Sequence, residues 1–358
     1  MTTIAGVHGV VAPHAYSQAQ ITEVFSRVVS PSGQHHGVIT RIHEHAQVES
    51  RSLALPLDAY EGLAGFGEAN DTYIRVGLEL AEEAIRGALQ SCGLEPADVD
   101  IIVSTSVTGV AAPSLDSRLV ALLGLRPDIR RVPMFGLGCV AGAAGIARVH
   151  DLLRGDPDGV AVLLAVELCS LTIQRDDTSM ANIVASALFG DGAAAVVMVG
   201  ERRARDLGLT GPSVVATTSR MYPDTERMMG WDIGATGFRI VLSAGVPDVV
   251  SAHLHDDVQE FLAQRDLSAA QVDRWICHPG GPRVLTAMEQ ALDLHDGQLD
   301  ITWRSLAAVG NLSSVSVLHV LRDTMCHPQS GLRPEAGMLG LMVALGPGFC
   351  SELVLLAW

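Results

Sequence analysis

The chain has 358 residues, of which 48% are hydrophobic and 18% charged, and its 40 acidic and 24 basic residues give a formal net charge of -16. All 24 basic residues are arginine, which excludes a lysine Schiff base, pyridoxal-phosphate attachment and a P-loop or kinase lysine. A net acidic chain without basic runs is also a poor binder of nucleic acid.

A chain of this length can bury a large core as one domain or two. No apolar run approaches the roughly 18 residues that a membrane span needs. The N-terminus shows no basic region followed by an apolar segment, so no signal peptide is predicted. Six scattered cysteines without a C-x-x-C pair favour reduced thiols. We therefore expect a cytoplasmic α/β protein without a transmembrane segment.

Helix-like and strand-like segments alternate along the chain, which predicts a layered α/β fold. In chain order we expect a helix at 71–92, a strand at 101–103, helices at 115–123 and 140–153, strands at 160–166 and 193–199, a helix at 249–264, a strand at 275–277 and a helix at 284–294. Pro282 fits the first turn of the last helix. The candidate domain boundary is the stretch 200–213, which is charged at first and then contains glycine and proline. It suggests an N-terminal half at 1–205 and a C-terminal half at 206–358.

Cys139 is the candidate nucleophile. It follows a turn that contains Gly136 and Gly138 and begins a helix of small residues. The free N–H groups and the positive end of a helix dipole stabilise a thiolate there and lower the pKa of the cysteine. A buried, inert thiol is the commoner fate of a lone cysteine, and the local sequence leaves both possibilities open.

Two further positions end segments in the same way. His278 closes the strand at 275–277 before a glycine-rich turn, and Asn311 follows Gly310 at a turn into a helix, where a simple N-cap is the alternative. Such strand ends and turns are where α/β proteins place active groups. Together with Cys139, an imidazole and a carboxamide suit decarboxylative Claisen condensation, because both can donate hydrogen bonds to a developing oxyanion. Cysteine proteases also use a Cys-His-Asn set.

A second group of histidines resembles a metal cluster at first sight. Its spacing is irregular and no cysteine lies nearby, so a solvated surface is the expected account of His35, His36, His43 and His45. We predict no metal site.

Three motifs resemble the chalcone and stilbene synthase family, the type III polyketide synthases. They are Gly138-Cys139-Val-Ala-Gly142, Trp275-Ile-Cys-His278-Pro-Gly-Gly-Pro282 and Gly310-Asn311-Leu-Ser-Ser314, and Ala187-Leu-Phe189-Gly-Asp-Gly192-Ala and Gly346-Pro-Gly348 extend the match. The resemblance implies a thiolase-like, five-layer αβαβα fold with two pseudo-duplicated halves, and a homodimer. It also implies acyl loading on Cys139, and decarboxylation and condensation of malonyl-CoA at His278 and Asn311, without a cofactor.

The resemblance implies a substrate pocket as well. Phe189 matches the phenylalanine that guards the junction of CoA tunnel and pocket. Further pocket positions are matched by Thr108, Cys169, Thr172 and Ser313. The second gatekeeper is Ile240 when counted back from Val246 without a gap, and Phe238 when a two-residue shift is allowed. Two arginines, Arg41 and Arg283, match positions that contact CoA, and a solvated surface arginine is the alternative for each.

Departures from the plant pattern favour an aliphatic starter. They are Ile240 at the pocket mouth, Leu345 in place of a phenylalanine and Ala112 in place of a methionine. Cys169 resembles bacterial members that make naphthols or long-chain pyrones. We therefore expect a medium or long fatty acyl-CoA starter, extended with malonyl-CoA or methylmalonyl-CoA and closed to an alkylresorcinol or alkylpyrone.

Three other functions stay open at this point. The nearest is a ketoacyl synthase of fatty-acid type, which performs a single condensation and takes an acyl carrier protein as partner. A cysteine hydrolase would cleave a thioester or peptide, and a non-catalytic family member would have a filled pocket and an unreactive Cys139.

Overall fold

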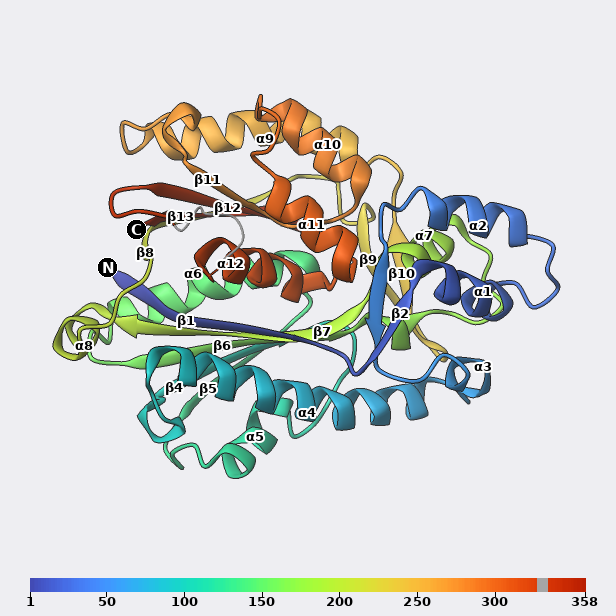
Figure 1. Ribbon diagram of the computed structural model, residues 1–358, viewed down its shortest axis with the longest axis horizontal. Helices are drawn as coiled ribbons and strands as arrows, with labels where there is room; N and C mark the ends of the chain where they lie inside the picture. Colours follow the sequence, from blue (N-terminus) through green and yellow to red (C-terminus); the bar gives the residue numbers. More distant parts are fainter. Residues whose placement is uncertain (327–333) are drawn as a thin grey trace.

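The structure is a computed structural model that describes residues 1–326 and 334–358. Nine strands form one sheet in the order β11-β12-β13-β8-β1-β7-β6-β4-β5 (Figure 1). Their bounds are β1 Thr2–Val11, β4 Ile101–Ser106, β5 Arg130–Phe135, β6 Val160–Leu168, β7 Asp191–Gly200, β8 Ser213–Met221, β11 Arg274–Cys277, β12 Leu339–Gly346 and β13 Cys350–Ala357. Two small antiparallel sheets pair β2 His14–Ser17 with β3 Ser50–Leu53, and β9 Met229–Gly234 with β10 Gly237–Leu242.

Twelve α-helices lie within the described residues. They are α1 Gln18–Val29, α2 His36–Glu44, α3 Ala59–Gly62, α4 Phe66–Cys92, α5 Leu115–Leu123, α6 Ala141–Arg154, α7 Met180–Leu188, α8 Glu201–Leu207, α9 Val246–Ala263, α10 Pro282–Ala291, α11 Asp300–Val309 and α12 Ser316–Cys326. None of these helices combines the length and the apolar character that crossing a membrane requires.

The sheet contains the same four-strand pattern twice. In the N-terminal half β4 runs parallel to β6, β7 is antiparallel to β6, and β1 is antiparallel to β7. In the C-terminal half β11, β12, β13 and β8 repeat these relations in the same order. The halves join where β1 and β8 pair antiparallel, Thr2 opposite Val214. The predicted pseudo-duplication is therefore confirmed. Residue 205 lies inside α8, and the boundary at that residue stays a prediction.

Helices and strands alternate in five layers (Figure 1). Helices α4 and α5 cover the outer face of the N-terminal half, α6 and α12 lie between the halves, and α9 and α10 cover the outer face of the C-terminal half. Successive side chains of a strand point to opposite faces of the sheet, so alternate residues pack against different helix layers. Val162 and Leu164 of β6 pack towards α4, whereas Ala161 and Leu163 pack towards α6. This is the expected αβαβα fold.

The middle layer depends on small residues at the start of α6. A Cβ atom on Gly142 would lie 2.4 Å from the carbonyl oxygen of Ser314, and one on Gly145 would lie 2.5 Å from the side chain of Leu163. Both inner helices follow a 3₁₀ turn, Gly138–Val140 before α6 and Ser313–Val315 before α12. The two 3₁₀ turns therefore lie at equivalent places in the two halves.

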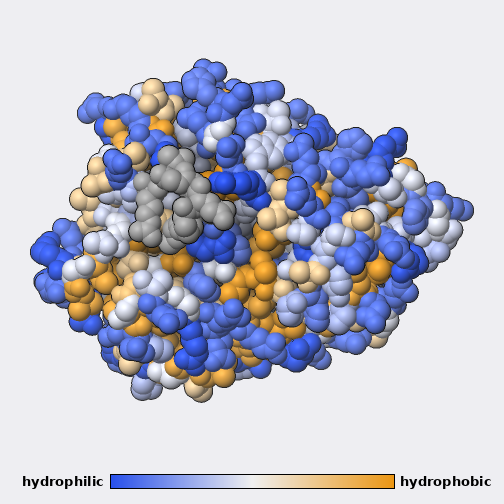
Figure 2. All heavy atoms as spheres, viewed as in Figure 1, coloured by the Kyte–Doolittle hydropathy of each residue, from blue (hydrophilic) through white to orange (hydrophobic). Residues whose placement is uncertain are grey.

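The polar and apolar surfaces follow these layers. On the face shown in Figure 2, the helices at the top and right present mainly polar side chains, and apolar side chains gather between them over the central strands. Strand β5 is one of the two edges of the sheet and exposes Val132 and Phe135. The homodimer that the resemblance implies stays a prediction. The thiols of Cys92, Cys139, Cys169, Cys277 and Cys350 are free.

We expect Gly142→Ala to cost roughly 1–3 kcal/mol of unfolding free energy, because the added methyl group overpacks the contact with Ser314. Urea unfolding measures this. Gly37→Ala on α2 is the matched control, since nothing lies within 4 Å of its added methyl group, and it should be neutral or stabilising. Equal midpoints for the two variants would contradict this account of the middle layer.

Candidate active site

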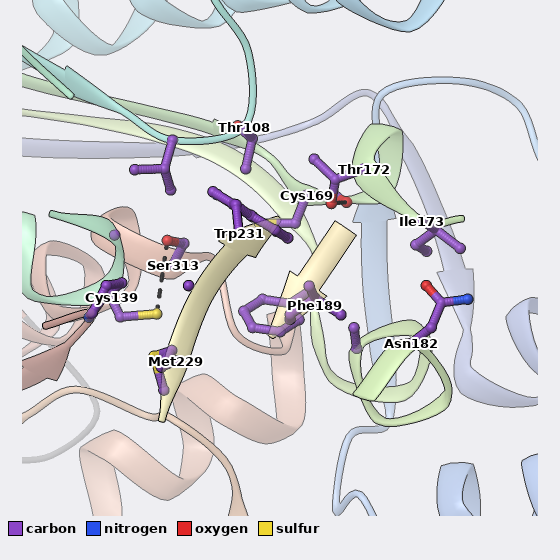
Figure 3. Close-up of a pocket in the computed structure, with 16 residues that line it drawn as sticks. Thr108, Cys139, Cys169, Thr172, Ile173, Asn182, Phe189, Met229, Trp231 and Ser313 are labelled. Carbon is purple, nitrogen blue, oxygen red and sulfur yellow. Dashed lines mark hydrogen bonds between the residues drawn. The ribbon is translucent and has the colours of Figure 1, made fainter. Parts of the chain in front are cut away.

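Cys139 lies in the 3₁₀ turn that leads into α6 and is 6% exposed. The turn needs glycine before it: Gly138 has a φ of 56°, and a Cβ atom there would lie 2.7 Å from the ring of Pro347. The thiol Sγ donates to Ser313 Oγ at 3.8 Å (Figure 3). The sequence prediction of a glycine turn, a cysteine and a tightly packed helix is confirmed.

His278 follows β11 directly, and its backbone N–H extends the ladder by donating to Val343 O at 2.8 Å. Its side chain is buried at 2% exposure, and neither Nδ1 nor Nε2 has a hydrogen-bond partner among the described residues. Leaving a buried polar group unpaired costs free energy, so an imidazole with two open nitrogens marks a place where a ligand's polar atoms fit.

Asn311 is held at both its backbone and its side chain. Its N–H donates to Leu188 O at 2.8 Å, and its carbonyl accepts from Gly190 N–H at 3.0 Å. Side-chain Oδ1 accepts from Ser313 N–H at 2.8 Å, and Nδ2 donates to Gly280 O at 3.3 Å. Since Nδ2 carries two hydrogens, one of them stays available to a ligand.

Two pockets meet at Cys139. The outer pocket, about 1790 Å³ including its open mouth, is lined by Cys139, Phe189, His278, Arg283 and Asn311 among others. The inner pocket, about 580 Å³, is lined by Cys139 and by the predicted residues Thr108, Cys169, Thr172, Phe189, Ile240 and Ser313 (Figure 3). Cys139, Phe189 and Met229 line both. A group carried on the Cys139 sulfur can therefore reach either space.

Comparison with known proteins identifies the family of the chain. The N-terminal domain of the chalcone and stilbene synthases matches residues 57–202, and their C-terminal domain matches residues 213–357. A 1,3,6,8-tetrahydroxynaphthalene synthase from Streptomyces peucetius subsp. caesius is 55% identical over 100% of this chain and 93% of its own. One from Streptomyces coelicolor is 32% identical over 89% of this chain and 82% of its own.

The chain belongs to the chalcone and stilbene synthase family. The crystal structure of the tetrahydroxynaphthalene synthase from Streptomyces coelicolor A3(2), titled a bacterial type III polyketide synthase, superposes with a TM-score of 0.91. That pair is 29% identical, and the match covers 99% of each chain. The protein is thus an enzyme of the acyltransferase class, a type III polyketide synthase with the thiolase-like fold.

The electrostatics of this type III polyketide synthase differ from the expectation for a helix terminus. Burial raises the pKa of the Cys139 thiol to about 12, and it lowers the pKa of His278 to about 3. The pKa of the Cys139 thiol is thus raised and not lowered as expected, and desolvation by burial is the largest cause. Hydrogen bonds with Ser313 and Asn311 lower the pKa of Cys139 by less than burial raises it.

The two candidate positions for the second gatekeeper, Ile240 and Phe238, have different surroundings in the structure. Ile240 lines the inner pocket, whereas Phe238 is 3% exposed and packs among aromatic rings. Its ring centroid lies 5.4 Å from that of Phe66, 5.9 Å from that of Trp231 and 6.4 Å from that of Phe135. Phe238 therefore supports the wall of the type III synthase pocket from behind.

Sequence reasoning missed two features of the inner pocket. Trp231 of β9 forms part of its wall, and no local motif marks that residue. Glu167 lies fully buried behind the pocket and accepts hydrogen bonds from Thr108 Oγ1 at 2.9 Å and Ser314 Oγ at 2.6 Å. Burial raises the pKa of Glu167. An acidic residue ending the apolar run of β6 was the available signal.

The predicted CoA-binding arginines differ in position. Arg283 is exposed and lines the outer pocket, whereas Arg41 is exposed but does not line it. Ile42 and His45, close to Arg41 at the end of α2, do line it. Arg41 thus lies beside the pocket mouth, and the role of both arginines stays a prediction.

The histidine group is not all surface. His43 is 1% exposed, with Nδ1 2.9 Å from Thr22 Oγ1 and Nε2 3.0 Å from Ser186 Oγ, so the expected solvated position is wrong for His43. Burial lowers the pKa of His43 to about 3. In the described ranges, no three histidine, cysteine or acidic side chains are arranged to hold a metal ion.

His278 should control the reactivity of Cys139. With a pKa of about 12, only about one thiol in 10⁵ is ionised at pH 7, so reaction at neutral pH needs a base that takes the proton. We expect His278→Ala to slow iodoacetamide alkylation of Cys139 at pH 7 by about tenfold or more, followed by intact mass. The difference in alkylation rate between His278→Ala and the wild type should become smaller towards pH 10, because a higher pH ionises the thiol without the help of a base.

His45→Ala is the control for this measurement, because His45 also lines the outer pocket. Its alkylation rate should match the wild type, and Cys139→Ala identifies the reacting thiol. An unchanged rate in His278→Ala would show that the imidazole does not activate the cysteine.

Proposed function

We propose that this type III polyketide synthase builds a tetrahydroxynaphthalene from malonyl-CoA alone. The observation that supports it is the 55% identity, over the full chain, to a 1,3,6,8-tetrahydroxynaphthalene synthase. A naphthalene ring has ten carbons, which five malonyl units supply when each of them, the starter unit included, loses one carbon as carbon dioxide. Such a product carries no alkyl chain from a fatty acyl starter. Malonyl-CoA then serves as both starter and extender.

The inner pocket is compatible with a compact chain. Trp231 and Phe189 narrow its space of about 580 Å³, and Ile173 and Asn182 line its far side (Figure 3). The Trp231 ring is supported by Phe238 behind it, with the ring centroids 5.9 Å apart. We therefore expect the inner pocket to receive a compact growing chain without an alkyl tail.

Loading begins at Cys139. Its proton passes to His278, and the thiolate attacks the carbonyl of the starter thioester. The carbon–sulfur bond to coenzyme A breaks, and coenzyme A leaves as its thiol with the proton returned. The acyl group is then held at the junction of the two pockets, where the inner pocket can receive it.

Extension takes place in the outer pocket. An N–H of neutral His278 and the free N–H of Asn311 Nδ2 donate to the thioester oxygen of malonyl-CoA. Loss of carbon dioxide breaks a carbon–carbon bond and leaves the electron pair as an enolate on that thioester. Its carbon attacks the acyl group on Cys139, which releases the thiolate and leaves the longer chain on CoA. Return of the chain to Cys139 allows the next extension.

A fatty acyl starter with resorcinol or pyrone closure is the competing outcome. Its support is the aliphatic lining of the pockets at Ile240 and Leu345. Methylmalonyl-CoA as extender and an acyl carrier protein as donor belong to the same set of alternatives.

Incubation with malonyl-CoA alone, with products separated and identified by mass spectrometry, tests the proposal. We expect a tetrahydroxynaphthalene or its oxidation product, and no product from Cys139→Ala. Parallel reactions contain octanoyl-CoA or palmitoyl-CoA together with malonyl-CoA. Alkylated resorcinols or pyrones as the main products would replace the proposed starter, and a single ketoacyl thioester would indicate a ketoacyl synthase.

We expect Arg283→Ala to raise the KM for malonyl-CoA by about fivefold with little change in kcat, because one charge-assisted contact to the substrate is lost. Arg41→Ala should act in the same direction and less strongly, since Arg41 lies beside the mouth. Arg75→Ala on α4 is the control, because its guanidinium is exposed and 3.8 Å from Glu79. An unchanged KM in both test variants would remove these arginines from the CoA site.

A further inference from the structure

Arg51 of β3 is a fully buried arginine, 1% exposed. Its Nε donates to Gln18 Oε1 at 3.1 Å and its Nη1 donates to Phe189 O at 2.7 Å, while Nη2 has no partner. Among the described residues no carboxylate lies within 4.0 Å of it. Burial lowers its pKa to about 9, which leaves it charged at neutral pH. A buried charge is costly, so its contacts need a reason beyond packing.

The contacts of Arg51 converge on two backbone segments. One is the carbonyl of Phe189, and the other is Gly310, where an added Cβ atom would lie 3.0 Å from both Cγ and Cδ of Arg51. These segments pair with each other in a parallel bridge: Asn311 N–H donates to Leu188 O and Gly190 N–H donates to Asn311 O. Arg51 therefore packs against both sides of the bridge that carries Phe189 and Asn311.

In the part of the chain that the structure describes, the polar groups near Arg51 form no ion pair with its guanidinium, which can therefore contact the Phe189–Asn311 bridge. Asp191 is the carboxylate whose charge acts on Arg51, but its oxygens accept from Ala54 N–H at 2.7 Å, Ser170 N–H at 2.8 Å and the Ser170 hydroxyl. The charge is thus balanced without contact. Gln18 relays the contact further, because its Nε2 donates to Ala187 O at 2.9 Å in the last turn of α7.

We propose that Arg51 is a positioning residue that fixes the Phe189–Asn311 bridge, so that decarboxylation and extension depend on it while the reactivity of Cys139 does not. Asn311 is itself part of this bridge, and Phe189 lines both pockets, whereas Cys139 is placed by a separate turn and by α6. The inference rests on the proposed role of Asn311 in decarboxylation.

The test compares two rates in each variant: iodoacetamide alkylation of Cys139, and release of carbon dioxide from malonyl-CoA. Arg51→Met should leave alkylation within about twofold of the wild type. It should lower kcat for decarboxylation roughly 10- to 100-fold, with KM changed less than about threefold, because a small displacement of Asn311 misplaces the enolate. Arg51→Lys keeps the charge but not the forked donors, and should recover part of the loss.

Arg148→Met is the matched control, since Arg148 binds the buried carboxylate of Glu352 at 3.0 Å and lines neither pocket. It should lower both rates by the same factor or neither. Equal losses of both rates in Arg51→Met, as reduced folding would give, or an unchanged kcat, would overturn the inference.

Two further results are distinguishable. If Arg51→Met does not fold, Arg51→Lys and Gln18→Met decide, and each should lose about three- to tenfold in decarboxylation with normal alkylation. Normal decarboxylation in both would overturn the inference. A wild-type protein that releases no carbon dioxide from malonyl-CoA would overturn the proposed function and this inference with it.

Discussion

The close approach of the two inner 3₁₀ turns is the constraint on which the site depends. Cys139 and Ser313 come from different halves of the chain, and their side chains meet only because Gly142 lets the Ser314 carbonyl approach α6. Any side chain at Gly142 would separate the halves where Cys139 and the segment of Asn311 face each other. The duplicated topology therefore does more than bury apolar surface, because it brings equivalent positions of the two halves to one point.

Burial at that point determines the chemistry of the site. The thiol of Cys139 and the imidazole of His278 are each held neutral by desolvation, so neither charge is present in isolation. In the proposed loading step, moving one proton from sulfur to nitrogen leaves the net charge of the buried pocket unchanged. In the proposed decarboxylation step, neutral His278 is the form that donates a hydrogen bond to an enolate without first forming a full ion pair. The same buried environment therefore suits both proposed steps.

The local signals at the site were strong enough to predict much of it. Cys139 and Asn311 each follow a turn with glycine, and His278 precedes one at the end of an apolar strand; all three line one pocket. The inner pocket residues came from the family resemblance. Trp231 and Arg51 could not be predicted, because a hairpin tryptophan and a strand arginine carry no local pattern and gain their positions from residues distant in sequence.

The missed strands have a physical reason as well. Glycine is unfavourable inside a strand, so Gly6 and Gly9 argue against a strand at β1. Both are nevertheless required by packing: a Cβ atom on Gly6 would lie 2.4 Å from Ala88 O, and one on Gly9 would lie 2.5 Å from the His319 ring. Strand β12 and residues 353–357 of β13 are continuous apolar runs that periodicity alone cannot separate from a buried helix. Tertiary contacts determine that these segments form strands, and these contacts are made with segments far away in the sequence.

The absence of lysine connects the composition to substrate capture. A net charge of -16 repels the polyanionic CoA at long range, and at physiological ionic strength this repulsion fades beyond about 8 Å. Capture then depends on what lies within that distance of the pocket mouth. Arg283 lies in the lining and Arg41 beside it, and a guanidinium can bind a phosphate with two hydrogen bonds where an ammonium acts as a point charge. Few arginines at a mostly apolar mouth can therefore bind the substrate, provided that each is placed to make a direct contact.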